Sequence, residues 1–243
     1  MRAVFFDLDG TLVELPEDFL GLFETALADH GIDADGEQCE FYTESFFEYL
    51  GECRDDPYRA AMADLRAEYG LDPSADALAE TYVEREAEAT TLESGVREAL
   101  DALAAGESAD SPAPDSPSGS EAAPVAADTA LGVLTNGAAR AQRRKLVHHD
   151  IAADFDAVVV SGDVGAGKPD SEIFAAAREA IPADEYVFVA DDLERDVLPA
   201  QEAGFTGVYV GEDAGEGGEN QSVATHRADF AVTSLREVPD LLG

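Results

Sequence analysis

The sequence has few cysteines, no tryptophan and no long apolar segment. Cys39 and Cys53 are the only cysteines among 243 residues. Two cysteines cannot form a disulfide framework, and their spacing fits no zinc motif, so we expect two free thiols. No apolar run approaches the ~18–20 residues that span a bilayer. Acid appears as early as Asp7, which is too soon for a signal peptide. These absences predict a cytoplasmic protein with no membrane partner.

Basic residues are also scarce. Lysine and arginine total 15 against 53 aspartates and glutamates, so the formal net charge is −38. Nucleic acids and anionic membranes bind basic surfaces, so neither is an expected partner. Repulsion among so many like charges destabilises a compact chain unless salt screens it, and at ~1 M salt the Debye length is about 3 Å. The composition is therefore typical of a halophilic protein that folds in a salt-rich cytoplasm.

The apolar residues are arranged in a pattern typical of an α/β protein. Hydrophobic residues make up 45% of the chain, as in globular proteins. Residues 2–6 form an apolar run that predicts a buried strand, followed by a tight turn at Gly10. From residue 129 onward, short apolar runs alternate with helical segments. This alternation predicts a Rossmann-like parallel sheet with helices on both faces.

A second unit interrupts this pattern directly after the first strand. Between residues 16 and 89, apolar residues recur at helical spacing in four clusters, which predicts an inserted α-helical cap. We assign residues 15–93 to this cap, and residues 1–14 and 94–243 to the Rossmann-like catalytic core. Residues 107–128 consist mostly of Ser, Pro, Ala, Gly and acid, which predicts a solvated acidic loop within the core.

The segment around Lys168 is similar to a phosphate-binding P-loop but lacks one of its groups. Gly162 is followed by four residues and then by Gly167 and Lys168. A P-loop needs a Ser or Thr hydroxyl on Mg²⁺ after the lysine, whereas Pro169 offers neither a hydroxyl nor an N–H group. Lys168 is one of only two lysines in the chain, so it must serve another purpose.

Polar residues gather where four of the predicted strands end. In open parallel sheets, ligands bind beyond the carboxyl ends of the strands. The polar residues and glycine at these ends are Asp7, Asp9, Gly10, Thr11, Thr135, Asn136, Lys168, Asp191, Asp192 and Asp196. Carboxylate and carbonyl oxygens suit Mg²⁺, and a carboxylate can attack phosphorus to give an aspartyl-phosphate. A metal ion and a lysine would stabilise the phosphoryl charge, and a second acid could protonate the leaving group.

The order of these motifs resembles the haloacid dehalogenase-like (HAD) superfamily, in particular its phosphoglycolate phosphatase and β-phosphoglucomutase-like group with a helical cap. The resemblance covers nearly the whole chain except the two acidic loops. It implies that Asp7 is the nucleophile and that Asp9 is the general acid and base. Thr135 and Lys168 would complete the catalytic set, which makes the likeness to a P-loop accidental.

The same resemblance implies a set of binding residues. The implied ligands of the substrate phosphate are Asp9, Gly10, Thr135, Asn136 and Lys168. The implied ligands of Mg²⁺ are Asp7, the Asp9 carbonyl and Asp191, with Asp192 and Asp196 in support. The family commonly has glycine where this chain has Ala190, and a small polar residue where it has Asp192. This departure leaves open which aspartate contacts the metal most directly.

The resemblance predicts an enzyme that hydrolyses a small phosphorylated metabolite with the help of Mg²⁺. Asp9 favours phosphoryl transfer, because members of the superfamily that dehalogenate typically lack an acid at this position. The alternatives are a 2-haloacid dehalogenase, a phosphomutase that uses the same residues, and a non-catalytic protein that binds a phosphometabolite.

The net charge leads to a first testable prediction. We expect the protein to lose its structure when salt is removed, because unscreened repulsion then acts across the whole chain. Circular dichroism spectra recorded during dialysis from ~1 M salt to dilute buffer will measure the change. A spectrum that stays the same without salt contradicts the prediction.

Overall fold

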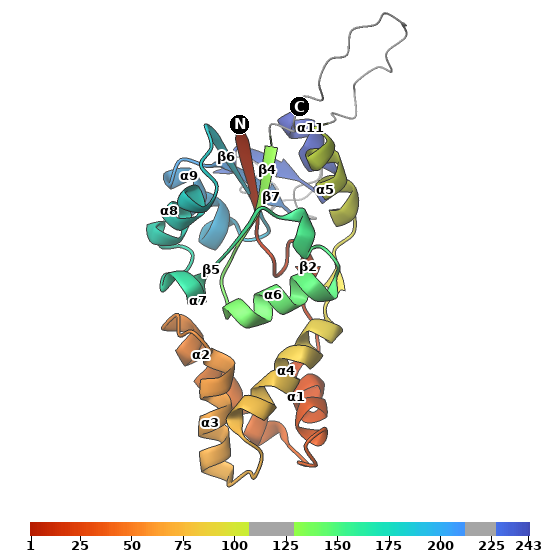
Figure 1. Ribbon diagram of the computed structural model, residues 1–243, viewed down its shortest axis with the longest axis vertical. Helices are drawn as coiled ribbons and strands as arrows, with labels where there is room; N and C mark the ends of the chain where they lie inside the picture. The colour runs from red at the N-terminus through yellow and green to blue at the C-terminus, as the bar shows by residue number, and fades with distance from the viewer. Residues whose placement is uncertain (107–128, 212–226) are drawn as a thin grey trace, which may run out of the picture.

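The structure is a computed structural model that describes residues 1–106, 129–211 and 227–243 (Figure 1). The acidic loop predicted at residues 107–128 lies outside the described residues. No helix in the described part of the chain is long and apolar enough to cross a membrane. Cys39 and Cys53 are both free thiols, as predicted.

The centre of the fold is a six-stranded sheet in the order β5-β4-β1-β6-β7-β8, and every neighbouring pair is parallel. Its strands are β1 (Arg2–Phe6), β4 (Thr129–Thr135), β5 (Ala157–Val160), β6 (Glu185–Ala190), β7 (Thr206–Val210) and β8 (Phe230–Val232). In the register of the sheet, Phe6 of β1 lies between Val133 of β4 and Val189 of β6. The carboxyl ends of these three strands therefore lie side by side, and the predicted Rossmann-like α/β fold is confirmed.

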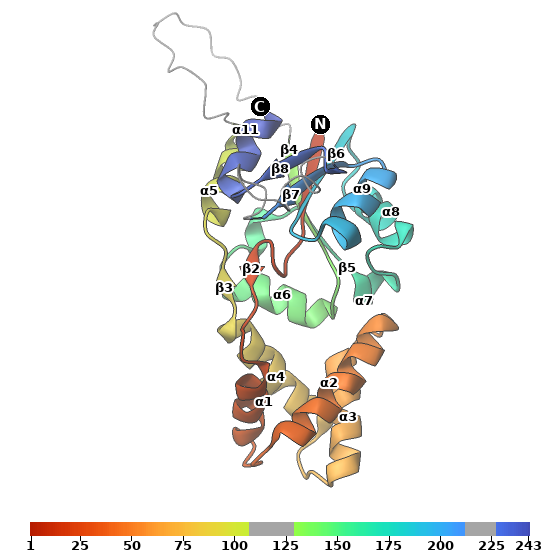
Figure 2. The same ribbon diagram turned by 180° about the vertical axis from the view of Figure 1, so that it is seen from behind.

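Helices cover both faces of this sheet, and Figures 1 and 2 show the layers from opposite sides. One face packs against α5 (Val96–Ala105), α6 (Ala139–His148) and α11 (Val238–Leu242), and the other against α8 (Ser171–Ala180) and α9 (Leu198–Glu202). In β1, Val4 and Phe6 pack on the first face, Ala3 and Phe5 pack on the second, and all four are fully buried. A strand covered on both faces needs apolar residues at successive positions, which explains the apolar run at residues 2–6.

Several short elements complete the described core. They are α7 (Ser161–Val164), the 3-10 helices η1 (Ala152–Asp154) and η4 (Leu235–Glu237), and the π-helix η2 (Leu193–Val197). The π-helix begins after Asp192, whose side chain accepts a hydrogen bond from the backbone N–H of Arg195. This cap fixes the turn that follows β6.

Four helices form a second layer, called here the helical unit: α1 (Phe19–Ala28), α2 (Gly36–Gly51), α3 (Pro57–Tyr69) and α4 (Ala75–Ala89). They share a hydrophobic cluster of their own. A side-chain oxygen caps the start of each helix, supplied in turn by Asp18, Asp35, Asp56 and Ser74. The unit joins the core through β2 (Val13–Glu14) and β3 (Thr91–Leu92), which pair antiparallel. The four predicted helical clusters therefore all correspond to helices.

Helix α6 lies between the sheet and the helical unit in both views (Figures 1 and 2). Ala138 and Ala141 pack into the hydrophobic cluster of the helical unit. Arg144 forms an ion pair of 2.9 Å with Glu80 of α4, and Arg140 pairs with the same carboxylate. Exposed ion pairs contribute only ~0–1 kcal/mol each, so the apolar contact carries most of the attachment.

The close contact between β4 and β1 leads to a prediction about stability. A Cβ atom at Gly132 would lie 2.4 Å from a ring carbon of Phe5. We expect Gly132→Ala to lower the thermal midpoint, because overpacking a core typically costs ~1–3 kcal/mol. Gly51→Ala is the control, since a Cβ atom there meets nothing within 4 Å. Thermal unfolding in high salt will compare the two, and equal midpoints contradict the prediction.

Candidate functional site

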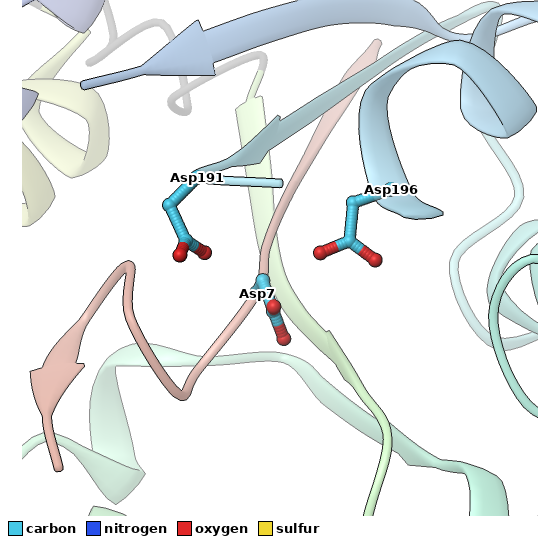
Figure 3. A group of neighbouring side chains, drawn as sticks. All are labelled: Asp7, Asp191 and Asp196. Atoms are coloured by element: carbon cyan, nitrogen blue, oxygen red, sulfur yellow. The ribbon is translucent and has the colours of Figure 1, made fainter. Parts of the chain in front are cut away.

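The candidate site lies at the carboxyl ends of β1, β4 and β6. Asp7 follows the last residue of β1 and is buried, and its backbone N–H donates to the carbonyl of Val189 at 2.9 Å. Asp191 follows the last residue of β6, and Figure 3 shows its carboxylate next to that of Asp7. Thr135 ends β4 and is also buried. Because β1 runs between the two other strands, these three side chains converge at one edge of the sheet.

Lys168 supplies the buried positive charge of the site. Its Nζ lies 2.9 Å from Asp7 Oδ1 and 3.0 Å from Asp196 Oδ1, and all three side chains are almost inaccessible to solvent. The side chain of Asn136 holds the lysine in place, because its Nδ2 donates to the carbonyl of Lys168 at 2.9 Å and its Oδ1 accepts from the Lys168 N–H at 2.8 Å. Asn136 thus links the end of β4 to the loop that carries Lys168.

Three carboxylates form a group that could hold a metal ion. Oxygen atoms of Asp7, Asp191 and Asp196 all lie within 4.8 Å of one another (Figure 3). Hard divalent cations such as Mg²⁺ prefer oxygen ligands of this kind. The hydroxyl of Thr11 donates to Asp191 Oδ1 at 2.9 Å and orients it. Asp192 lies outside the group and caps the π-helix, so the geometry favours Asp191 as the metal-facing member of the acidic pair.

Gly10 is required by the close approach of Asp191. Its φ is +92°, and a Cβ atom at this position would lie 2.3 Å from Asp191 Oδ2. A residue with a side chain would therefore be strained and would displace the carboxylate. The N–H of Gly10 donates to the carbonyl of Val13 at 2.8 Å, so this group closes the turn. A contact between Gly10 and phosphate stays a prediction.

Arg195 is a site residue that the sequence did not indicate. Its guanidinium lies 3.1 Å from Asp196 Oδ2 and 3.8 Å from Asp7 Oδ2. Asp196 is therefore bound by both Lys168 and Arg195, which leaves it poorly placed to be a principal metal ligand. The short turn of η2 brings Arg195 back over the site, and such a turn has no distinctive sequence pattern.

Two further residues that sequence reasoning missed bind Asp9. Lys145 Nζ lies 2.8 Å from Asp9 Oδ1, and Gln142 Nε2 donates to Asp9 Oδ2 at 2.9 Å. The same amide group lies 2.9 Å from the hydroxyl oxygen of Thr135 and 3.1 Å from the carbonyl of Asn136. Lys145 lies three residues after Gln142 on α6, so both reach the same side of the helix. The rarity of lysine in this chain is the signal that could have identified Lys145.

Burial raises the pKa of two carboxylates of the site, Asp7 and Asp191. Burial raises the pKa of Asp7 to about 7, although Lys168 opposes the shift. Asp196 and Asp9 raise the pKa of Asp7 further through repulsion. Burial also raises the pKa of Asp191, against the effect of its hydrogen bond from Thr11. A site with several buried carboxylates and few cations attracts a divalent cation, which would favour their ionised forms.

The arrangement suits chemistry at an electrophile with anionic oxygens. Leu8 N and Lys168 both lie within 3 Å of Asp7 Oδ1, at 2.7 and 2.9 Å, which leaves Oδ2 as the available oxygen. A carboxylate oxygen beside a lysine can attack as a nucleophile while the cation stabilises negative charge on the substrate. Asp9 follows two residues later and could transfer a proton to or from the same substrate.

Comparison with known proteins links this geometry to a family. A family model described as haloacid dehalogenase-like hydrolase matches residues 1–204. The chain is 40% identical over 111 residues to a phosphoserine phosphatase of Thermus thermophilus, a match that covers 45% of this chain and 43% of the relative. It is 32% identical over 114 residues to a glyceraldehyde 3-phosphate phosphatase of Methanocaldococcus jannaschii, covering 46% and 48%. These matches thus span less than half the length of the curated relatives.

Solved structures are similar over the full length. A HAD phosphatase of Thermococcus onnurineus is 25% identical with a TM-score of 0.61, covering 100% of this chain and 98% of that one. A 2-haloacid dehalogenase of Pseudomonas syringae has a TM-score of 0.69 at 22% identity, with the same coverage. At that identity, the second likeness concerns the fold alone.

The raised pKa of Asp7 leads to a prediction for the metal-free protein. A carboxyl group has an ordinary pKa of about 3.9, so between pH ~4 and ~7 the folded state holds a proton that the unfolded state has lost. Binding of this proton therefore stabilises the folded state most strongly below pH ~4, and this contribution disappears as the pH rises to ~7. We expect Asp7→Asn to raise the thermal midpoint in chelator at pH 8, and to raise it less at pH 5. Lys168 keeps Asp196 as its partner in this variant.

Thermal unfolding of the wild type and variant at both pH values, in high salt, measures this difference. Asp184→Asn is the matched control, because Asp184 is exposed and lies away from the site, where it pairs with the N-terminal amine. A variant that is less stable than the wild type at pH 8 contradicts the prediction.

Proposed function

Because the chain belongs to the haloacid dehalogenase-like hydrolase family, we propose that it hydrolyses a small phosphomonoester through an aspartyl-phosphate on Asp7. One observation carries the proposal: a buried aspartate with a free oxygen lies 2.9 Å from a buried lysine, and a second acid follows two residues later. The curated relatives named above, which act as phosphatases, support the same reaction class.

In the proposed first step, Asp7 Oδ2 attacks phosphorus and the bond between phosphorus and the leaving oxygen breaks. Asp9, in its protonated form, transfers its proton to that oxygen, so the alcohol leaves as a neutral molecule. Lys168 remains paired with Asp7 Oδ1 and offsets repulsion between the carboxylate and the phosphate. Arg195, which lies 3.8 Å from Asp7 Oδ2, would add a second positive charge at the phosphoryl group.

In the second step, Asp9 takes a proton from water, whose oxygen attacks phosphorus. The bond between phosphorus and Asp7 Oδ2 then breaks, which frees inorganic phosphate and restores the carboxylate. The Thr135 hydroxyl, which accepts from Gln142 and donates to the Asn136 carbonyl at 3.2 Å, would turn to donate to a phosphoryl oxygen. The backbone of Asn136 would bind another, since its side chain is used in holding Lys168.

We propose Mg²⁺ as the cofactor, bound by Asp7, Asp191 and the carbonyl of Asp9, with Asp196 and Asp192 in support. The donors are all oxygens, which suits a hard divalent cation. When bound, the ion neutralises charge on the phosphate and favours the ionised form of Asp7. The chain's own residues position the nucleophile, the proton donor and the phosphoryl oxygens.

The helical unit fits the role of a cap in this proposal. Residues 15–93 would form the cap, and residues 1–14 and 94–243 the catalytic core. The unit lies against α6, whose side chains bind Asp9, so it adjoins the side of the site from which the alcohol would leave. The relatives named for phosphoserine and glyceraldehyde 3-phosphate suggest a small phosphorylated metabolite as substrate. The net charge of −38 suggests that the reaction takes place in a salt-rich cytoplasm.

The proposal is tested by phosphate release from a panel of small phosphomonoesters in high salt, with and without Mg²⁺. We expect turnover of at least one ester with Mg²⁺, loss of turnover in chelator, and a fall of about a thousandfold or more in Asp7→Asn. Asp184→Asn, remote from the site, should keep full activity.

Other outcomes would reassign the reaction. Release of halide from a 2-haloacid without Mg²⁺ would indicate a dehalogenase, and a requirement for a bisphosphorylated sugar would indicate a phosphomutase. Tight binding of a phosphometabolite without turnover would indicate a binding protein. Normal turnover by Asp7→Asn would reject Asp7 as the nucleophile.

A further inference from the structure

Helix α6 carries two buried polar side chains that the proposed steps do not require as reactants. Gln142 is 1% exposed and Lys145 is 2% exposed, although both types of residue are usually at the surface. Burying a charged or polar group is unfavourable unless it is paired. Both are paired with Asp9, Lys145 through Oδ1 at 2.8 Å and Gln142 through Oδ2 at 2.9 Å. Each contact uses one oxygen of the carboxyl group, and each oxygen keeps a second lone pair that can carry the transferred proton.

This double contact fixes the direction of the Asp9 side chain. A carboxyl group held at one oxygen can still rotate, whereas one held at both oxygens cannot do so without breaking a bond. Gln142 also contacts Thr135, a proposed phosphate ligand, at 2.9 Å. One amide group therefore sets the position of Asp9 relative to the place where the phosphoryl group would bind.

A buried carboxylate of the helical unit favours the charged form of Lys145. Glu86 of α4 is 6% exposed, and its Oε2 accepts a hydrogen bond of 2.7 Å from the hydroxyl of Tyr58. Burial raises the pKa of Glu86, against the effects of Lys145 and Tyr58. Burial also lowers the pKa of Lys145, but the carboxylates of Glu86 and Asp9 outweigh this, and the net shift is upward. Lys145 thus interacts with one acid of the core and one acid of the helical unit.

We propose that Gln142 and Lys145 are positioning residues that aim the Asp9 carboxyl group at the leaving oxygen of the substrate. The inference rests on the proposed function. It assigns to α6 a part in the proton transfer that involves no direct contact with the reacting atoms.

A comparison of substrates with good and poor leaving groups can test this positioning role. An alkyl phosphate has a poor leaving group that needs the proton of Asp9, whereas p-nitrophenolate leaves readily without one. A misplaced Asp9 should therefore slow alkyl esters far more than p-nitrophenyl phosphate. The comparison uses kcat/KM, because this quantity reports the steps up to formation of the aspartyl-phosphate and not its hydrolysis.

The experiment measures kcat/KM for the best alkyl phosphate and for p-nitrophenyl phosphate, with Mg²⁺ in high salt. We expect Lys145→Met and Gln142→Leu to lose about a hundredfold on the alkyl ester. On the aryl ester, the same variants should lose less than about fivefold. Lys145→Arg should restore much of the alkyl activity.

Arg144→Met is the matched control. Arg144 neighbours Lys145 on α6 and pairs with Glu80 of the helical unit, but it is exposed and does not contact Asp9. This variant should keep the wild-type ratio between the two substrates. Circular dichroism establishes that each variant is folded, and if Lys145→Met does not fold, Gln142→Leu decides the question.

Two results would overturn the inference. One is an equal loss on both esters, which would mean that the residues only maintain the structure. The other is unchanged activity on the alkyl ester. A wild-type protein that cleaves neither ester would instead overturn the proposed function, and the inference with it.

Discussion

The site depends on one buried ammonium group between two buried carboxylates. Lys168 lies 2.9 Å from Asp7 and 3.0 Å from Asp196, and without it these acids would face each other in a region from which water is nearly excluded. Buried charges need compensating partners, so the three side chains constrain one another. Asn136 fixes Lys168 through two hydrogen bonds to its backbone. This interaction joins β1, the end of β4, the loop after β5 and the turn after β6 around one charge.

Helix α6 connects the site to the helical unit. One face of the helix carries Gln142 and Lys145, which bind Asp9, and also Ala141, which packs against the helical unit. The proposed nucleophile and the second acid are therefore held in place by different structural elements. The nucleophile is fixed by the sheet and by Lys168, whereas the second acid is fixed by a helix that also supports the helical unit.

The sequence predicted the sheet and most of the candidate site, because each depends on local pattern. Apolar runs of strand length identified five strands of the sheet, but not β8, which has only three residues. Asp7 and Asp191 were found because acids directly follow such runs. Lys145 could not be found in this way, since a lysine on a helix with several arginines is normally exposed. It is buried against Asp9, which lies 136 positions away in the sequence. Arg195 was missed for a related reason, because its place depends on the tight turn of η2.

The distribution of charge at α6 means that ionic strength acts on this molecule in two opposing directions. The helix holds Arg140, Arg143, Arg144 and Lys145, four of the fifteen basic residues of the chain, and two of these arginines pair with Glu80 across the junction with the helical unit. Screening reduces the overall repulsion within a chain of charge −38, but it weakens these exposed pairs as well. A high salt concentration would thus stabilise each layer, because it reduces the overall repulsion. It would also weaken the exposed ion pairs between the two layers. The apolar contacts of Ala138 and Ala141, which salt does not weaken, would then hold the two layers together.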